Sequence, residues 1–457
     1  MIKKPNMIFI FSDQQRWDTV GSYGQELKIT PNLDRLAEKG VCFKNIFTCQ
    51  PVCGPARSCI QTGKYATQTG CYRNSIALPQ NEKTIANWFS EAGYEVGYIG
   101  KWHLASTTGK SYECIEEEHD YRKSAIPFNR RGGYKDYWLA SDVLEFTSNS
   151  FQGHLFNNNM EKVEFSSYRI DAITDFVIDY LKTRDGKKPF FLYTSYVEPH
   201  QQNNENRVVG PEGSKKKYGN YAVPEDLKDT EGDWQKNYPD YLGCCARLDY
   251  SIRRILNELE KLGLSNNTII FYNSDHGCHF KTRNKDIING YDDYKRSCHE
   301  SSIRVPLIAY GPGFNSGIVV NGLVSSIDIP PTLLQCAGIK KPNYMQGFPL
   351  QGLLNGNVKN WREEVFIQIS ESQVGRAIRT KKWKYSVRAP EKDGRLYASS
   401  DIYIDDFLYD LENDPYEKNN LVDNIDFKDV KNWLRNKLKE RMVKANEKEP
   451  EIKDKHV

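Results

Sequence analysis

Residues that could bind a cation and an oxyanion follow four short apolar runs of the chain. Asp13 follows the run Asn6–Phe11, and Lys101 and His103 follow Glu95–Ile99. His200 follows Phe190–Tyr196, and Asp275 and His276 follow Thr268–Tyr272. These runs are typical of buried strands, and ligands of an open parallel sheet bind outside the carboxyl ends of its strands. A single histidine or aspartate at such a place is more often a surface or capping residue. Their joint placement predicts one crevice that holds them all.

A cysteine lies inside PVCGPARSCIQTG, residues 51–63, two residues before Pro55 and four before Arg57. Pro55 suits the first turn of a helix, where its fixed φ is favourable and its missing N–H costs nothing. Cys53 would then lie at a helix N-terminus with Arg57 one turn on, where the dipole and the guanidinium favour an anionic group. The alternatives are a plain buried thiol or a zinc site with Cys42, Cys49, Cys59 or Cys71, but the chain has no paired C-x-x-C spacing.

The elements that must position these residues are alternating strands and helices. A fifth apolar run is Val305–Tyr310, and helical spacing recurs in Ile173–Leu181 and in Leu248–Leu259, ahead of Gly263. This alternation predicts an α/β sheet covered by helices. After about Leu354 the pattern changes to shorter strands and a last amphipathic helix: Val365–Ile369, Arg376–Ile378, Trp383–Val387 and Val430–Met442. We therefore expect a catalytic domain over residues 1–354 and a smaller C-terminal α+β subdomain over residues 355–457.

Composition excludes several classes of protein. The 457 residues are 39% hydrophobic and 27% charged, which is ordinary for a globular protein. A net charge of +3 gives no reason to expect a nucleic-acid partner, and no apolar run approaches the roughly 18 residues of a membrane span. The Met7–Phe11 run is too short for a secretory signal, so we expect a cytoplasmic location for the chain as given, unless a leader was trimmed before numbering. Eleven cysteines then fit reduced thiols.

The motif Cys53-Gly54-Pro55-Ala56-Arg57, followed by Thr62-Gly63, resembles the C-x-P-x-R signature of type I sulfatases in the alkaline phosphatase superfamily. Nearly the whole chain shares the resemblance, through SDQQRWDTVGSYG, TPNLDRLAEKGVCFKNIFT, GKWHL, NNTIIFYNSDHG, IRVPLI, IDIPPTLL, WKY and LYDLENDPYEKNNL. It implies an alkaline phosphatase-like fold, a large mixed, mostly parallel sheet sandwiched by helices. It also implies that a formylglycine-generating enzyme reads the Pro and Arg and oxidises the Cys to formylglycine (3-oxoalanine).

The resemblance also implies which residues form the site. The metal ligands would be Asp13, Gln14, residue 53, Asp275 and His276, with Ca²⁺ as the expected cation and Mg²⁺ or Mn²⁺ as alternatives. Gln14 stands where many members have a second Asp, which weakens the negative charge at the metal; Ala56 and Gln61 replace a usual Ser and Leu. Lys295 is identified by its register, five residues before Glu300.

The chemistry implied by these parts is transfer of a sulfuryl group to formylglycine. One hydroxyl of its hydrate, made more acidic by the cation, would attack sulfur and expel the alcohol; the second would then lose its proton as sulfate leaves. Arg57, Lys101 and Lys295 would neutralise the sulfate oxygens. His103 would position the hydrate, and His200 would protonate the leaving oxygen.

The predicted substrate is a sulfated carbohydrate, ahead of a simple aryl sulfate. Three segments expected to ring the crevice mix aromatic, Arg and amide side chains that suit sugars: Asn129–Trp138, Asn149–Asn159 and Gln201–Asn206. The alternatives are an arylsulfatase or choline-sulfatase-like enzyme, a phosphonate monoester hydrolase or phosphodiesterase of the same superfamily, a two-zinc phosphatase, and a sugar-binding pseudo-sulfatase with an unmodified Cys53.

Overall fold

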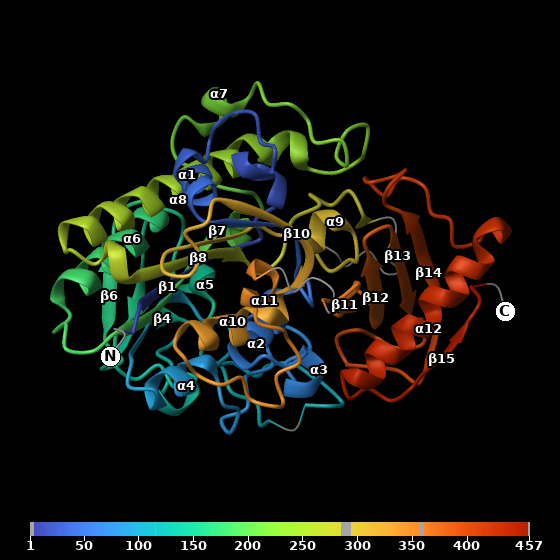
Figure 1. Ribbon diagram of the computed structural model, residues 1–457, viewed down its shortest axis with the longest axis horizontal. Helices are drawn as coiled ribbons and strands as arrows, with labels where there is room; N and C mark the ends of the chain where they lie inside the picture. The colour runs from blue at the N-terminus through green and yellow to red at the C-terminus, as the bar shows by residue number, and fades with distance from the viewer. Residues whose placement is uncertain (1–3, 115, 285–293, 356–360, 456–457) are drawn as a thin grey trace.

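A computed structural model describes residues 4–114, 116–284, 294–355 and 361–455 (Figure 1). Its larger sheet has the strand order β10-β2-β9-β8-β1-β7-β3-β4-β5-β6. The strands are β1 (Asn6–Asp13), β2 (Val41–Phe47), β3 (Glu95–Lys101), β4 (Tyr137–Ser141), β5 (Gly153–Phe156), β6 (Lys162–Phe165), β7 (Phe190–Pro199), β8 (Thr268–Ser274), β9 (Leu307–Tyr310) and β10 (Ile318–Ser325). Neighbours from β8 through β1, β7 and β3 to β4 are parallel, whereas β9, β5 and β6 pair antiparallel.

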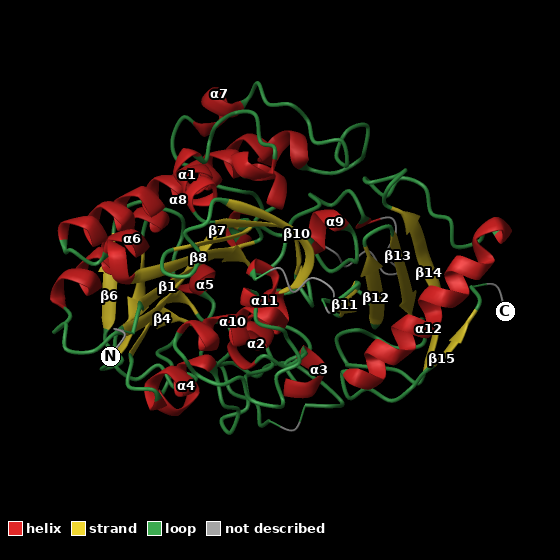
Figure 2. Cartoon of the chain, in the orientation of Figure 1, coloured by secondary structure: helices red, strands yellow, loops and turns green. Residues whose placement is uncertain are grey.

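Helices cover both faces of this sheet, as Figure 2 shows. They are α1 (Pro31–Lys39), α2 (Cys53–Thr62), α3 (Ala66–Thr69), α4 (Ile85–Glu91), α5 (Leu144–Thr147), α6 (Arg169–Thr183), α7 (Ser214–Tyr218), α8 (Trp234–Lys261), α9 (Glu300–Ile303), α10 (Ile329–Cys336) and α11 (Gln351–Leu354). Because successive side chains of a strand point to opposite faces, Met7, Phe9 and Phe11 of β1 pack with α2, α4 and α10, whereas Ile8 and Ile10 pack with α1, α6 and α8. The helix-covered mixed sheet confirms the predicted fold class.

The five predicted strands are β1, β3, β7, β8 and β9, and the two predicted helices lie within α6 and α8. The apolar pattern of the sequence did not predict β2, β4, β5, β6 and β10. These strands are short or carry polar residues and glycine, as in IVVNGLVS of β10, so their apolar pattern is weak. Tertiary pairing with a neighbouring strand makes them regular.

The C-terminal part forms a second sheet in the order β11-β12-β13-β14-β15. Its elements are β11 (Glu364–Ile369), β12 (Gly375–Thr380), β13 (Trp383–Arg388), β14 (Ile402–Asp410), β15 (Glu451–Lys453) and α12 (Lys428–Lys444), gathered at one side of the molecule in Figure 1. Leu434, Leu438 and Met442 of α12 pack on Ile378 and Tyr385 of this sheet. The boundary at residue 354 stays a prediction, since the second sheet itself begins at Glu364.

Two properties of the described residues bear on the class of protein. All eleven cysteines are free thiols. Among the described residues, no helix combines the length and the apolar character that crossing a membrane requires.

The parallel pairing decides which loops can reach the predicted site. Strands β8, β1, β7 and β3 all run the same way, so their carboxyl ends meet at one edge of the sheet. In β4, Tyr137 pairs with Gly97 and Ser141 with Lys101. The segment before β4 therefore lies at the opposite edge. The prediction that Asn129–Trp138 rings the crevice is wrong, because this segment precedes β4 or forms its first two residues. Gln201–Asn206 follows β7 at the site edge, whereas Asn149–Asn159 runs through the antiparallel strand β5 and ends at the opposite edge, where Asn158 Oδ1 accepts from the Trp138 N–H at 2.7 Å.

Candidate active site

Four of the predicted metal ligands converge on one point. Asp13 ends β1, Asp275 and His276 follow β8, and Cys53 begins α2. One ligand atom from each of these four buried residues lies within 4.8 Å of all the others. The Cys53 Sγ atom is 3.5 Å from Asp13 Oδ1 and 3.2 Å from His276 Nε2.

Helix α2 presents Cys53 to this point because of how its first turn is held. Val52 is extended and supplies no side-chain cap, but the Gly54 N–H donates a hydrogen bond to Asn74 Oδ1 at 2.9 Å. All ten residues of α2 are buried. The helix starts two residues before Pro55, so the predicted placement of Cys53 at a helix N-terminus is confirmed.

The two carboxylates differ in how their charge is stabilised. Burial raises the pKa of Asp13, but the positive charges of Lys101 and Arg57 outweigh burial and hold this pKa below its ordinary value. Lys101 Nζ lies 2.8 Å and Arg57 Nη2 lies 3.0 Å from Asp13 Oδ2. For Asp275, burial and repulsion by Asp13 raise the pKa to about 6. Its closest cation contact, Arg57 Nη2, is 3.5 Å away.

Positive charges also surround the cysteine. Lys295 Nζ lies 3.1 Å from Cys53 Sγ. Burial raises the pKa of the Cys53 thiol, but Lys295, Lys101 and His276 outweigh burial, and a hydrogen bond from His103 adds to their effect. The pKa of Cys53 is therefore well below the usual thiol value. An anionic or strongly polar atom is favoured at this position.

The imidazole of His200 is oriented by its neighbours. Its Nδ1 atom lies 2.7 Å from the carbonyl oxygen of Gln201, so Nδ1 carries the hydrogen. Nε2 is then free to accept from Lys295 Nζ at 3.0 Å. His200 and Lys295 are thus joined by a hydrogen bond beside residue 53. His103 has a left-handed backbone with φ of 60°, and its N–H donates to the Asp142 carbonyl at 2.8 Å.

Gln14 is at the site, but its amide is engaged elsewhere. Its backbone N–H donates to Asp275 Oδ1 at 2.9 Å. Its side-chain nitrogen donates to Gln201 Oε1 at 2.8 Å, and its side-chain oxygen lies 3.3 Å from Lys295 Nζ. Its role as a metal ligand stays a prediction.

The donor set fits a divalent cation. Asp13 and Asp275 repel each other, as the raised pKa of Asp275 shows, and a cation between them would remove that repulsion. His276 Nδ1 donates to the Gly277 carbonyl at 3.0 Å, so Nε2 faces Cys53 Sγ and the two carboxylates and can bind a cation through its lone pair when it is not protonated. The Cys53 sulfur is the fourth of these grouped ligand atoms. Hard oxygen ligands with one imidazole suit Ca²⁺, Mg²⁺ or Mn²⁺.

Glu145 belongs to the site and was missed in the sequence. It lies on α5, four residues after β4, and its Oε1 atom is 2.5 Å from Lys101 Nζ and 3.8 Å from His200 Nδ1. The signal that could have found it is the one that identified Asp13, a charged residue soon after a strand. That signal was lost because the short strand β4 was not predicted.

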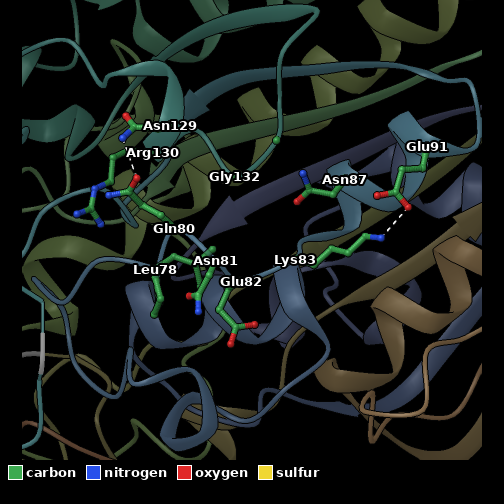
Figure 3. A pocket seen from close by; sticks show the side chains of 12 residues that line it. Leu78, Gln80, Asn81, Glu82, Lys83, Asn87, Glu91, Asn129, Arg130 and Gly132 are labelled. Atoms are coloured by element: carbon green, nitrogen blue, oxygen red, sulfur yellow. Dashed lines mark hydrogen bonds and ion pairs between the residues drawn. The ribbon is translucent and has the colours of Figure 1, made fainter.

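A surface pocket elsewhere in the molecule has no part in this site. Figure 3 shows it beside α4, where Lys83 and Glu91 form an ion pair of 2.6 Å. Its volume is about 210 Å³, and Asn129 and Arg130 contribute to its lining. None of the predicted site residues is among its described lining residues.

Comparisons with known proteins identify relatives over the whole chain. A family model described as Sulfatase matches residues 5–339, and one described as N-sulphoglucosamine sulphohydrolase, C-terminal, matches residues 289–444. An ulvan-active sulfatase of Formosa agariphila is 30% identical over 464 residues, which cover 97% of this chain and 82% of that protein. An N-acetylglucosamine-6-O-sulfatase of Bacteroides thetaiotaomicron is 25% identical, with 99% of this chain and 88% of that protein covered.

A solved structure shares the fold. It was determined in complex with its substrate D-glucosamine-2-N,6-O-disulfate, is 23% identical and has a TM-score of 0.78, covering 98% of this chain and 99% of that one. The likeness includes both sheets.

Proposed function

Because the chain belongs to the sulfatase family and is a sulfuric ester hydrolase, we propose that it removes sulfate from a carbohydrate by means of a formylglycine made from Cys53. The observation that carries the proposal is the position of Cys53. It lies at the N-terminus of α2, in contact with His276 and Lys295 and beside two carboxylates that fit a cation. The relatives named for ulvan and for N-acetylglucosamine 6-sulfate support a sugar as the alcohol part of the substrate.

Formylglycine would supply the attacking oxygen, and a cation held by Asp13, Asp275 and His276 would make that oxygen more acidic. The chain's own residues do the rest. The positive charge that a sulfate group needs is supplied by Arg57 and Lys101, which contact Asp13, and by Lys295, which contacts residue 53. Such fixed charges in a water-poor site stabilise the charge that develops on the sulfate oxygens.

The leaving alcohol of a sugar requires a proton. A sugar alkoxide is a poor leaving group, so protonation by a positioned acid is worth about 10²–10⁴-fold in rate. His200 Nε2 lies 3.0 Å from Lys295 Nζ, beside residue 53, and accepts a hydrogen bond from that ammonium. We assign the delivery of that proton to His200, whose Nε2 atom would take it from the Lys295 ammonium and pass it to the leaving oxygen.

The test is a desulfation screen with protein produced together with a formylglycine-generating enzyme. The panel holds sulfated mono- and oligosaccharides that differ in sulfate position, with 4-nitrophenyl sulfate and a phenylphosphonate ester beside them, and a Cys53→Ala variant as control. We expect release of sulfate from at least one saccharide, and none with Cys53→Ala. An enzyme much faster on aryl sulfate than on any saccharide would refute the carbohydrate assignment, and preference for the phosphonate ester would favour the phosphonate monoester hydrolase alternative.

A further inference from the structure

Glu145 places a full negative charge inside the site at a position that the proposed mechanism does not use. Its side chain is 2% exposed. Burial raises the pKa of Glu145, but Lys101 and His200 outweigh burial and lower it to about 2. The carboxyl is therefore ionised at neutral pH. Its Oε2 atom is buried and has no hydrogen-bond partner within the described parts of the chain.

Glu145 shares its ion-pair partner with a second carboxylate. Its ion-pair partner Lys101 also contacts Asp13 Oδ2 at 2.8 Å, so one ammonium serves two carboxylates. The site as a whole contains three fixed cations and three carboxylates, namely Arg57, Lys101, Lys295, Asp13, Asp275 and Glu145. Removal of the Glu145 carboxylate would make the net charge around Lys101 more positive by one unit.

We propose that Glu145 is a specificity-determining residue that makes the site favour singly charged oxyanion esters over doubly charged ones. The inference rests on the proposed function, since it takes the anion beside Lys101 to be the sulfate group. A sulfate monoester carries one negative charge, whereas a phosphate monoester carries two above its second pKa of about 6. Each charge on the substrate is repelled by Glu145, so the dianion is repelled twice as strongly.

The size of the effect follows from the distances. Glu145 Oε1 lies 2.5 Å from Lys101 Nζ, and a charge-assisted hydrogen bond from Lys101 to the oxyanion would add about 2.8 Å. The two anions are then roughly 5–7 Å apart. At an effective dielectric constant of about 20, the repulsion from one additional substrate charge corresponds to roughly 50- to 300-fold in relative affinity.

The experiment compares Glu145→Gln with Glu145→Asp and Glu364→Gln in the cation-loaded, formylglycine-containing protein at pH 8. Glu145→Gln removes the charge and keeps the shape, whereas Glu145→Asp keeps the charge. Glu364 is a 7% exposed carboxylate of the C-terminal sheet that pairs with Arg441, so Glu364→Gln controls for loss of a buried negative charge elsewhere. Thermal melting establishes that each variant is folded.

The first measurement is kcat/KM for 4-nitrophenyl phosphate divided by kcat/KM for the preferred sulfate ester. We expect this ratio to rise roughly 50- to 300-fold in Glu145→Gln and to stay within about threefold of wild type in Glu145→Asp and Glu364→Gln. If Glu145→Gln lowers both activities by the same factor, Glu145 only holds Lys101 in place and the proposal is wrong.

The second measurement does not depend on turnover. Calorimetry gives the affinity for inorganic phosphate, a dianion at this pH, and for methanesulfonate, a monoanion. We expect Glu145→Gln to raise the affinity for phosphate relative to methanesulfonate by a similar factor. An unchanged relative affinity, or no binding of phosphate by this variant, would overturn the proposal. If the relative affinity shifts as expected but wild type hydrolyses no sulfate ester, the proposed function is refuted. The effect of Glu145 on the charge of the bound anion then still holds.

Discussion

Replacement of Asp275 with asparagine is expected to stabilise the metal-free protein and at the same time abolish its metal binding. Asp275 is fully buried, and burial together with repulsion by Asp13 raises its pKa from 3.8 to about 6. A carboxyl whose pKa is higher in the folded protein than in the unfolded chain destabilises the fold once it ionises. The penalty therefore begins above pH 3.8 and is complete above pH 6.

The expected magnitude follows from the shift. One pKa unit corresponds to 1.36 kcal/mol, so a rise from 3.8 to about 6 costs about 3 kcal/mol of unfolding free energy at pH 7.5. At pH 4.5 the same linkage gives only about 1 kcal/mol. Asparagine keeps an oxygen that accepts from the backbone N–H groups of Gln14 and His276 and has no charge to bury. The unfolding free energy that Asp275→Asn gains over wild type should thus grow between pH 4.5 and pH 7.5.

Asp13 provides the matched control, because its pKa is shifted the other way. Lys101 and Arg57 contact its Oδ2 atom and hold its pKa below the ordinary value, so its ionised form stabilises the fold. Asp13→Asn should therefore destabilise the metal-free protein at pH 7.5, where Asp275→Asn stabilises it.

The assay is urea unfolding of chelator-treated protein at pH 4.5 and pH 7.5, followed by thermal melting with added Ca²⁺ or Mn²⁺. Wild type should gain stability from the cation, and both variants should lose that gain together with activity. If both variants are destabilised equally without metal, the opposite pKa shifts of Asp13 and Asp275 are refuted. If Ca²⁺ stabilises Asp275→Asn as much as wild type, Asp275 is not a ligand.

Three further predictions concern the nucleophile, the leaving group and the second sheet. Peptides spanning residue 53 should carry an aldehyde that reacts with a hydrazide, and an active enzyme that keeps a Cys53 thiol would contradict this. His200→Ala should reduce kcat for a sugar sulfate by about 10²–10⁴-fold but that for 4-nitrophenyl sulfate far less; equal losses would assign His200 to sulfate binding. Glu300→Gln, which breaks contacts of 2.8 Å to Lys384 and 3.2 Å to Arg379, should cost about 3–5 kcal/mol in denaturant unfolding, because it removes the carboxylate that the buried Arg379 contacts and leaves Lys384 to Glu417. The exposed Glu91→Gln should cost less than about 1 kcal/mol, and similar costs for the two would contradict the reasoning.

The sequence by itself determined the parts of the protein whose signal is local. Apolar runs such as Met7–Phe11 predict buried strands, and the residue after such a run must lie near the carboxyl end of its strand. Asp13, Lys101 and Asp275 were found in this way. Pro55 indicated the start of a helix, and α2 begins within two residues of it. Each of these inferences depends only on neighbours in the chain.

Only the tertiary structure decided which strands are neighbours and which loops share an edge. Strand β1 pairs with β7 and β8, more than 180 residues away, and no local pattern specifies that order. Glu145 reaches Lys101 because β4 pairs parallel with β3, and the same pairing moves Asn129 to the opposite edge. The opposite pKa shifts of Asp13 and Asp275 are likewise set by distances to cations from separate segments. Such contacts depend on through-space packing and electrostatics, which residue type and spacing do not determine.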